Sequence, residues 1–382
     1  MKVKLGELTK IRTGKLDANA SSPDGEYPFF TCYKEPLKIS SYSYDCECVL
    51  VAGNGDLNVK YYNGKFDAYQ RTYIIEDNSN GRLYLPYLYY FMNGYVEELR
   101  KLSIGGVIKY IKLRNLTDAL IELPDIETQK YIVSILSKIK ELIDSRYQEL
   151  KILENLIKAR FVELFGEPGT NPMNWKETTI GEECFYIKDG PHKSLSDIGK
   201  ENGGHPFISV RNIVDGYINF SNAKYISDED YAAAIKKCHP EKGDMLYSKG
   251  GTTGIAKLID VEEKFANWVH VAVLKFDKEK LNGVFFENML NSTYCYEQSQ
   301  RLTKGIANRD LVLSAMAQIK MYRPPLELQN QFADFVAQID KSKLLSGCRL
   351  FHSWAPENRD KPKHVGVPRR KTKVLRGGRR QQ

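Results

Sequence analysis

Residues 123–168 read LPDIETQKYIVSILSKIKELIDSRYQELKILENLIKARFVELFGEP, and this stretch decides the architecture. The helical pattern starts after Pro124 and Asp125. Glu127 lies in its first turn, where a helix N-terminus favours a carboxylate. Gly166 and Pro168 then end the pattern. Between these limits apolar residues recur every seven positions, with companions three positions further on, as in a coiled coil. The predicted seam is Leu136, Ile139, Ile143, Leu150, Leu153, Ile157 and Leu164.

A helix of this length predicts a spacer between domains. At 1.5 Å per residue, ~39 residues make a rod of roughly 58 Å, which is longer than a small domain is wide. Arg146 and Arg160 occupy two companion positions, so the partner is expected to supply acids or solvent there. The alternative is an amphipathic helix that lies on a globular core.

A degenerate repeat predicts the partner helix. Residues 324–329, PPLELQ, match residues 124–129, PDIETQ, at an offset of 200 positions. Each match is weak alone, because glycine turns and proline stops recur in many proteins. Their common order is hard to assign to chance. The other matching segments are 5–7 with 180–182, 11–14 with 187–190, 27–31 with 205–209, 49–55 with 245–251, and 66–69 with 265–268.

Each repeat begins with a mixed module. Short β-branched and aromatic runs, such as residues 72–75 and 269–274, alternate with glycine and asparagine turns. The predicted class is α+β, with two mixed α/β modules in tandem, separated by long helices that form an antiparallel coiled-coil spacer. The predicted boundaries are 1–122 for the first module, 123–168 for the spacer helix, 169–323 for the second module and 324–345 for a shortened distal helix.

The distal helix is expected to be about half as long as the first. Its apolar stripe is Phe332, Phe335, Val336, Ile339 and Leu344. Prolines and a basic run then make residues 346–382 a disordered tail in the prediction. A change of reading frame or a rearrangement is the favoured interpretation of this tail, and a nucleic-acid-binding extension is the alternative. The short helix should face the C-terminal part of the first one, which leaves the seam around Leu136 and Ile143 bare.

Composition and charge fit a two-domain protein of the cytosol. The 382 residues are 42% hydrophobic and 27% charged, and neither a bilayer-spanning run nor a signal sequence is recognisable. The net charge is +8, but residues 346–382 hold 11 Lys/Arg and 2 Asp/Glu, so the remainder is near neutral. Any DNA-binding face must therefore come from local placement of basic residues. The seven cysteines are scattered, and Cys46 and Cys48 lack a second ligand pair, so reduced thiols and no metal site are expected.

Catalytic motifs are not recognisable. A DNA adenine methyltransferase needs a glycine-rich cofactor turn and an Asn/Asp-Pro-Pro-aromatic motif. Residues 165–169 carry a proline where the cofactor would meet backbone, and residues 171–175 lack the second proline. Residues 249–254 resemble a phosphate cradle but lack the Gly-Lys-Ser/Thr ending. The chain is therefore expected to be no enzyme and to bind no cofactor.

With the repeat and the helix established, the chain resembles the specificity subunits of type I restriction-modification systems over roughly residues 1–345. The stretches that carry the resemblance are 123–129, 164–167 continuing to Asn171, Pro172 and Trp175, 206–212, and 324–329. The resemblance implies two target-recognition domains that each read half of a split DNA site. It also implies two modification subunits that bring S-adenosylmethionine and methylate adenine N6, and a restriction subunit that uses ATP and Mg²⁺.

Candidate functional residues follow from the two modules. Loop side chains would read bases, as arginine reads guanine and asparagine reads adenine, and phosphate contacts would fix the register. The candidate DNA-binding residues are Arg71, Lys109, Arg114, Arg211, Asn212, Lys249, Thr252, Lys304 and Arg309, with a solvated surface residue as the alternative for each. The predicted spacer and subunit-interface residues are Leu136, Ile139, Ile143, Leu150, Leu153, Ile157, Leu164, Phe332, Phe335 and Ile339. The alternative functions are a truncated or decoy specificity subunit and a stand-alone DNA-modifying enzyme.

Overall fold

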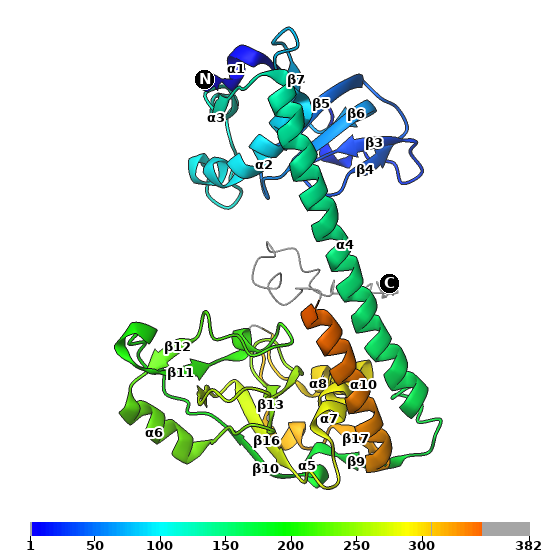
Figure 1. The fold of residues 1–382 in the computed structure, drawn as a ribbon, viewed down its shortest axis with the longest axis vertical. Helices are drawn as coiled ribbons and strands as arrows, with labels where there is room; N and C mark the ends of the chain where they lie inside the picture. Colours follow the sequence, from blue (N-terminus) through cyan, green and yellow to red (C-terminus); the bar gives the residue numbers. More distant parts are fainter. Residues whose placement is uncertain (1, 307, 346–382) are drawn as a thin grey trace, which may run out of the picture. The chain divides into compact units, whose positions relative to one another are not determined.

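The computed structural model describes residues 2–306 and 308–345 (Figure 1). The predicted tail, residues 346–382, lies outside the described residues. The chain divides into two compact units, residues 1–147 and 148–382, and the division falls within one long helix, α4 (Ile126–Phe165). No helix of the described ranges is both long and apolar enough to cross a membrane.

The first unit is built on a six-stranded sheet in the order β2-β7-β5-β6-β3-β4. Its pairs are antiparallel except for β3 with β6, which is parallel. Alternate residues of β5 serve two cores, because Val49 and Val51 pack beneath helix α2 while Cys48 and Leu50 pack on the other face. The elements are β1 (Lys2–Lys4), α1 (Leu5–Leu8), β2 (Thr9–Thr13), η1 (Ala18–Ala20), β3 (Tyr27–Phe30), β4 (Leu37–Ile39), β5 (Tyr44–Ala52), β6 (Val59–Ala68), β7 (Thr72–Asp77), α2 (Leu85–Leu102), α3 (Leu113–Thr117) and β8 (Leu120–Glu122).

The second unit repeats this plan. A four-stranded sheet, β10-β16-β13-β14, corresponds to β2-β7-β5-β6, and a three-stranded sheet, β12-β11-β15, corresponds to β4-β3-β6 with the same parallel pair. The terminal pair β1-β8 recurs as β9-β17. The tandem repeat predicted from weak motifs is thus confirmed by strand order and direction. The elements are β9 (Lys176–Thr179), α5 (Ile180–Glu183), β10 (Cys184–Asp189), η2 (Lys200–Asn202), β11 (His205–Ile208), η3 (Val210–Asn212), β12 (Lys224–Ile226), α6 (Asp228–Lys237), β13 (Met245–Ser248), β14 (Ala256–Leu258), β15 (Ala266–Asn267), β16 (Val271–Phe276), α7 (Gly283–Leu290), α8 (Thr293–Leu302), α9 (Leu313–Met316), β17 (Lys320–Arg323) and α10 (Leu326–Leu345).

Both long helices contact the hydrophobic core of the second unit. The C-terminal end of α4 and the N-terminal half of α10 contribute side chains to it. Phe332 of α10 lies between two rings of α4, with ring centroids 5.3 Å from Phe161 and 5.7 Å from Phe165. Because late residues of α4 meet early residues of α10, the helices are antiparallel, as predicted. The short helix also faces the C-terminal part of the first one, as predicted.

The packing of α4 corrects the predicted seam in two respects. Ile157 and Leu164 are only partly buried against the core, whereas Phe161 and Phe165, which the heptad pattern left out, are buried. Arg160 meets neither a partner acid nor bare solvent, since its guanidinium lies 5.7 Å from the Phe335 ring centroid and 2.8 Å from Glu163 of its own helix. An aromatic face takes the place of the expected acid.

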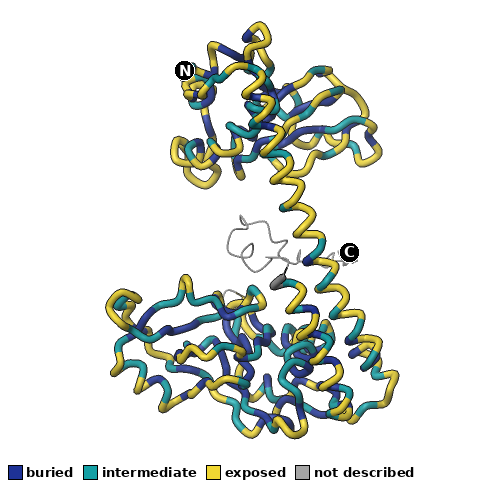
Figure 2. The backbone as a smooth tube through the Cα atoms, in the orientation of Figure 1, coloured by how far each residue is buried: buried dark blue, intermediate teal, exposed yellow. Residues whose placement is uncertain are grey.

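The N-terminal half of α4 lies on its own module. The Tyr90 and Ser137 hydroxyls are 3.0 Å apart, and Lys140 Nζ lies 3.3 Å from the Tyr89 hydroxyl, which places this half on α2. The alternative of a helix on a globular core therefore holds for this part. Leu136 and Ile143 are half-buried and not bare, while Ile139 is 46% exposed. Figure 2 shows α4 as exposed or half-buried along most of its length. Of the remaining predicted seam residues, Leu150 is buried and Leu153 half-buried in α4, and Ile339 is buried in α10.

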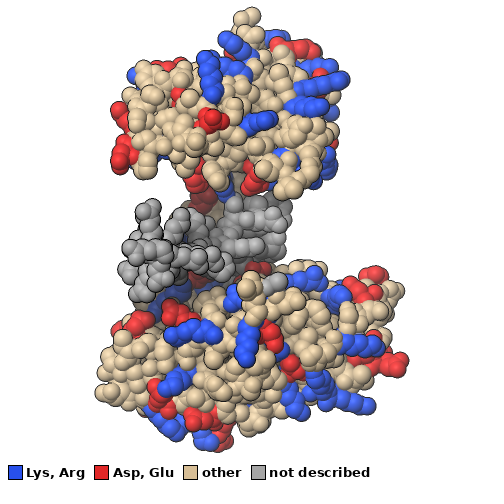
Figure 3. Space-filling model, turned by 180° about the vertical axis from the view of Figure 1, so that it is seen from behind, with Lys and Arg blue, Asp and Glu red and all other residues tan. Residues whose placement is uncertain are grey.

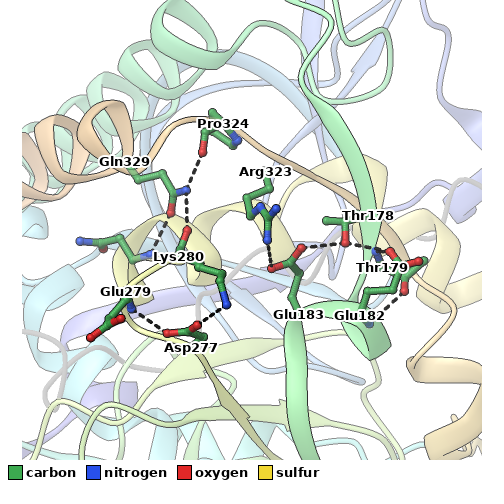
Figure 4. A network of polar contacts seen from close by, with 11 residues as sticks. Thr178, Thr179, Glu182, Glu183, Asp277, Glu279, Lys280, Arg323, Pro324 and Gln329 are labelled. Carbon is green, nitrogen blue, oxygen red and sulfur yellow. Dashed lines mark hydrogen bonds and ion pairs between the residues drawn. The ribbon is translucent and has the colours of Figure 1, made fainter.

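Each long helix begins at a buried glutamine that we call its clamp, and the two glutamines make equivalent hydrogen bonds. Gln129 is buried, accepts a hydrogen bond from Tyr84 N (2.8 Å) and donates to the carbonyls of Arg82 (2.7 Å) and Pro124 (2.8 Å). Gln329, 200 positions later, repeats the arrangement with Asn282 N (2.8 Å) and the carbonyls of Lys280 (3.3 Å) and Pro324 (2.8 Å) (Figure 4). The clamps fix where each helix leaves its module.

Candidate nucleic-acid interface

Each module brings two glycine turns together by backbone hydrogen bonds. In the first, Gly55 N donates to Lys109 O (3.0 Å) and Ile111 N to Gly53 O (2.9 Å). In the second, Gly251 N donates to Arg309 O (3.0 Å) and Leu311 N to Lys249 O (2.7 Å). We call residues 53–55 with 104–111 the first turn pair, and residues 249–251 with 304–311 the second turn pair.

The longer loop of each turn pair is closed by the same bridge. Residues 104 and 110 exchange two backbone hydrogen bonds of 3.0 and 2.9 Å, and residues 304 and 310 exchange two of 2.9 Å. Gly105 (φ 120°) and Gly305 (φ 85°) turn the chain where a side chain would be strained. Because backbone groups and glycines define the scaffold, the remaining side chains can differ between the modules.

Several predicted DNA-binding residues gather at these turns. Lys109 lies in the first turn pair, and Arg71 adjoins it because its carbonyl accepts a hydrogen bond from Gly53 N (2.7 Å). Lys304 and Arg309 lie in the second turn pair, and Thr252 directly follows its shorter turn. Lys109, Arg71, Lys304 and Thr252 are exposed, whereas Arg309 is half-buried and donates to Gln300 Oε1. The structure thus brings sequence-distant candidates together in both modules.

Apolar side chains at the loop tips were missed by the sequence analysis. Val107 and Ile306 are fully exposed, at 104% and 100%, and Ile108 is 62% exposed. The sequence did contain a signal for these exposed tips, because in each loop an apolar residue directly follows glycine. Exposed apolar groups beside lysines suit contact with thymine methyls and other apolar parts of base edges.

Lys249 is corrected from a base reader to a structural residue. Its side chain is 6% exposed, and its ammonium lies 3.0 Å from Asp310 Oδ1 and 3.5 Å from Asp189 Oδ2. Lys237 Nζ also lies 3.0 Å from Asp189 Oδ1. The charge of Lys249 is neutralised inside the module, so it is not available to DNA.

Asn212 is corrected in the same way. The residue is 1% exposed, and Oδ1 accepts a hydrogen bond from Ser209 N (2.8 Å). Its amide nitrogen donates to Asn219 O (2.8 Å) and Asn222 Oδ1 (2.9 Å). This amide closes a loop of the second module and has no free edge for adenine.

The two remaining candidates lie outside the turn pairs. Arg211 is exposed and lines a small pocket of about 230 Å³ together with Lys224 and Trp268. Arg114 is exposed on α3, where its Nε lies 2.8 Å from Asp118 Oδ2. The pair raises the pKa of Arg114, so its cation is held beside a carboxylate.

A cleft of about 450 Å³ adjoins the first turn pair. Burial raises the pKa of the Tyr73 hydroxyl in its wall, and the charge of Arg71 is near enough to oppose that shift. Tyr73 donates to Ile111 O (3.2 Å), which ties the cleft to the loop. The lining residues are Thr13, Gly14, Lys15, Gly53, Gln70, Arg71, Tyr73 and Ile111.

The titratable groups of the described residues include several buried thiols. Within residues 2–306 and 308–345, no three His, Cys, Asp or Glu side chains are grouped to hold a metal ion. Burial raises the pKa of the Cys184 thiol to about 12 and that of the Cys238 thiol to about 11, so both stay protonated. On the face drawn in Figure 3, Lys and Arg are interspersed with Asp and Glu, in keeping with the near-neutral charge of the chain without its tail.

Comparison with known proteins identifies relatives of the whole arrangement. The sequence matches a family model described as the type I restriction modification DNA specificity domain over residues 1–155 and 172–347. It is 39% identical over 185 residues to the EcoDI specificity subunit of Escherichia coli, spanning 48% of this chain and 41% of that subunit. It is 23% identical over 308 residues to the MjaVIII specificity subunit of Methanocaldococcus jannaschii, spanning 76% of this chain and 72% of that subunit. The S subunit of a type I restriction-modification system from M. genitalium has the same fold, with a TM-score of 0.58, 18% identity, and 93% of this chain and 94% of that chain covered.

Proposed function

The chain belongs to the type I restriction-modification DNA specificity family, and we propose from this premise that it is the non-catalytic, DNA-reading subunit of such a complex. One observation carries the proposal. The same backbone scaffold, a turn pair, is built in each module and presents different side chains in the two copies. Two unlike readers on one chain favour a bipartite site with two unlike halves.

The proposed contacts divide by module. Arg71, Lys109 and the loop tip at Val107 would meet one half-site, and Thr252, Lys304 and the tip at Ile306 would meet the other. Half-sites read by a symmetric pair of modules lie on the order of 34 Å apart along DNA, or multiples of it. A helix of 40 residues, α4, is long enough to span such a separation.

Catalysis in this proposal belongs to partners. Modification subunits would bind S-adenosylmethionine and methylate adenine N6, and restriction subunits would use ATP and Mg²⁺ for translocation and cleavage. The exposed apolar side chains of α4, including Ile139 and Leu142, offer a surface for the modification subunits. Incubation of the purified chain alone with labelled S-adenosylmethionine and DNA should transfer no methyl group, and transfer would favour a stand-alone enzyme.

Exchange of the first module tests the proposal directly. Residues 1–122 end with β8, just before the spacer helix, so they can be replaced by those of another family member without cutting an element. We expect one half of the methylated motif to change and the other half to stay intact, because each module reads separately. The motif is measured by methylation-resolving sequencing of host DNA in cells that also carry the modification subunit.

The reciprocal exchange of residues 169–323 is the matched control, and it should change the opposite half. A change in both halves after either exchange would contradict separate readers. A chain that co-purifies with the modification subunit but supports no methylation with any module would identify a decoy.

A further inference from the structure

We propose that the cleft beside the first turn pair binds one backbone phosphate of DNA, and that Lys249 fills the equivalent place in the second module and excludes such a contact. The inference rests on the proposed function, because it assumes that the turn pairs face DNA. It adds a phosphate-binding site in the first module, and it predicts that the second module, although built on the same scaffold, lacks that site.

The equivalence of the two places follows from the backbone. Gly53 and Lys249 occupy equivalent positions, because each donates its N–H to the residue just before the next strand of its sheet. Gly53 N donates to Arg71 O (2.7 Å), before β7, and Lys249 N donates to His270 O (2.8 Å), before β16. Each also accepts a hydrogen bond from the longer loop of its turn pair, as given above. Tyr110 and Asp310 correspond because each closes that loop.

The third pair of positions is Thr13 and Asp189. Thr13 ends β2 opposite Tyr73, and Asp189 ends β10 opposite Ala272. A glycine follows each of them, and in both cases a Cβ at that glycine would collide with a neighbouring backbone carbonyl, at 2.1 Å for Gly14 and 1.7 Å for Gly190. The second module therefore has Lys, Asp and Asp where the first has Gly, Thr and Tyr.

In the second module these residues satisfy one another. The buried ammonium of Lys249 is shared by Asp189 and Asp310, as described above, and Lys237 adds a second cation at Asp189. The two cations balance the two carboxylates, so the place carries no net charge. A phosphate that approached it would meet a carboxylate before a free cation.

In the first module the same place is open and cationic. A Cβ at position 53 would lie 2.4 Å from Arg71 O, so the first module accepts no side chain like that of Lys249 at this position. No carboxylate among the described residues lines the cleft. Lys15 and Arg71 are exposed at its wall, and neither has an ion-pair partner in the described part of the chain. The nearest acid in the hydrogen-bond network, Asp17, accepts from Gln70 Nε2 at 2.8 Å.

Phosphate is the ligand that fits these groups. An unpaired guanidinium can donate two parallel hydrogen bonds to a phosphate, and a nearby lysine adds a second positive charge. A contact of this kind holds register and carries no base information. The first half-site would then be held more strongly by salt-sensitive contacts than the second.

The test measures the affinity of the full chain, in complex with its modification subunit, for a fluorescent duplex as a function of salt. We expect Arg71→Gln to weaken binding about tenfold at low salt, as a lost hydrogen bond to a charged group would. The slope of log affinity against log salt should fall by about 0.9, the value of one phosphate contact. The loss should be the same on a duplex with the methylated motif and on a scrambled one.

A second variant adds the carboxylate of the second module to the first. Thr13 is exposed, and its printed hydrogen bond, from the Tyr44 hydroxyl, goes to its backbone carbonyl, which the substitution keeps. Thr13→Asp should therefore reduce affinity and slope like Arg71→Gln. Lys249→Met is the matched control in the second module and should leave the slope unchanged. Thermal melting of each variant checks folding.

The outcomes separate the two proposals. If the complex binds DNA and both first-module variants keep its affinity and slope, the phosphate site is wrong while the proposed function stands. A loss confined to the methylated motif would make Arg71 a base reader and overturn the inference, as would a lower slope in a folded Lys249→Met variant. Failure of the unaltered complex to bind DNA would overturn both proposals.

Discussion

Replacement of Phe332 by alanine is expected to lower the free energy of unfolding of the second unit by about 3–5 kcal/mol, the cost of deleting a fully buried aromatic side chain. The ring is 0% exposed. It packs against Phe161 and Phe165 of α4, so its loss leaves a cavity where α10 meets the spacer helix. The variant should also loosen the antiparallel contact of the two helices.

Tryptophan fluorescence in urea measures this effect selectively. None of the three tryptophans lies in residues 1–147, and Trp175 and Trp268 lie in the described part of the second unit, so the signal of these two rings reports that unit. Val162→Ala is the matched control, because Val162 follows Phe161 in the same helix and is 42% exposed. The control should change stability by less than about 0.5 kcal/mol. A loss below about 1 kcal/mol for Phe332→Ala would contradict the anchoring role of the ring.

The parts of the fold that were predictable from sequence are those with local signals. The spacer helix was expected to start after Pro124 and stop at Gly166, and α4 runs from Ile126 to Phe165. Proline, a first-turn carboxylate and a terminal glycine act on the residues beside them, so no distant contact is needed to recognise them. The repeat was recognisable for the same reason, since its conserved order of turns and prolines reflects backbone geometry.

The side chains that fill a seam were less predictable. The heptad pattern placed Arg160 on the interface and left Phe161 out, whereas the ring is buried and the guanidinium covers Phe335. A heptad gives the angle of a residue around the helix axis, but the second core presents a broad surface with more than one ridge. Residues beside the seam can therefore be buried more deeply than the seam itself.

The burial of polar residues in turns and short helices was the least predictable feature. Lys249 and Asn212 have the composition of an exposed DNA reader, yet both are buried. Asp310, one partner of Lys249, lies 61 residues away in the sequence, and no local pattern announces such a pair. The difference between a surface lysine and a buried one is made by tertiary contacts, which is why only the region of the site was predictable.

Removal of the glutamine clamp is the second large effect that we expect. Gln329→Ala would leave Asn282 N–H and the carbonyls of Lys280 and Pro324 without their partner. A buried polar group without a hydrogen bond costs about 1–3 kcal/mol. Because water can reach part of the opened space, we expect a total loss of about 3 kcal/mol for the second unit, measured by tryptophan fluorescence in urea.

The repeat supplies an internal comparison for this variant. Gln129→Ala breaks the equivalent clamp of the first unit, so the tryptophan transition should stay within about 0.5 kcal/mol while limited proteolysis of residues 1–122 becomes faster. Asn330→Ala is the matched control in the second unit, since Asn330 is exposed and its side chain only accepts a hydrogen bond from Asn282 Nδ2 (2.8 Å). If Gln329→Ala proves as mild as Asn330→Ala, the clamp does not fix the start of α10. A tryptophan transition that shifts equally for Gln129→Ala and Gln329→Ala would mean that the two units unfold together, and the clamps would then stabilise one cooperative structure.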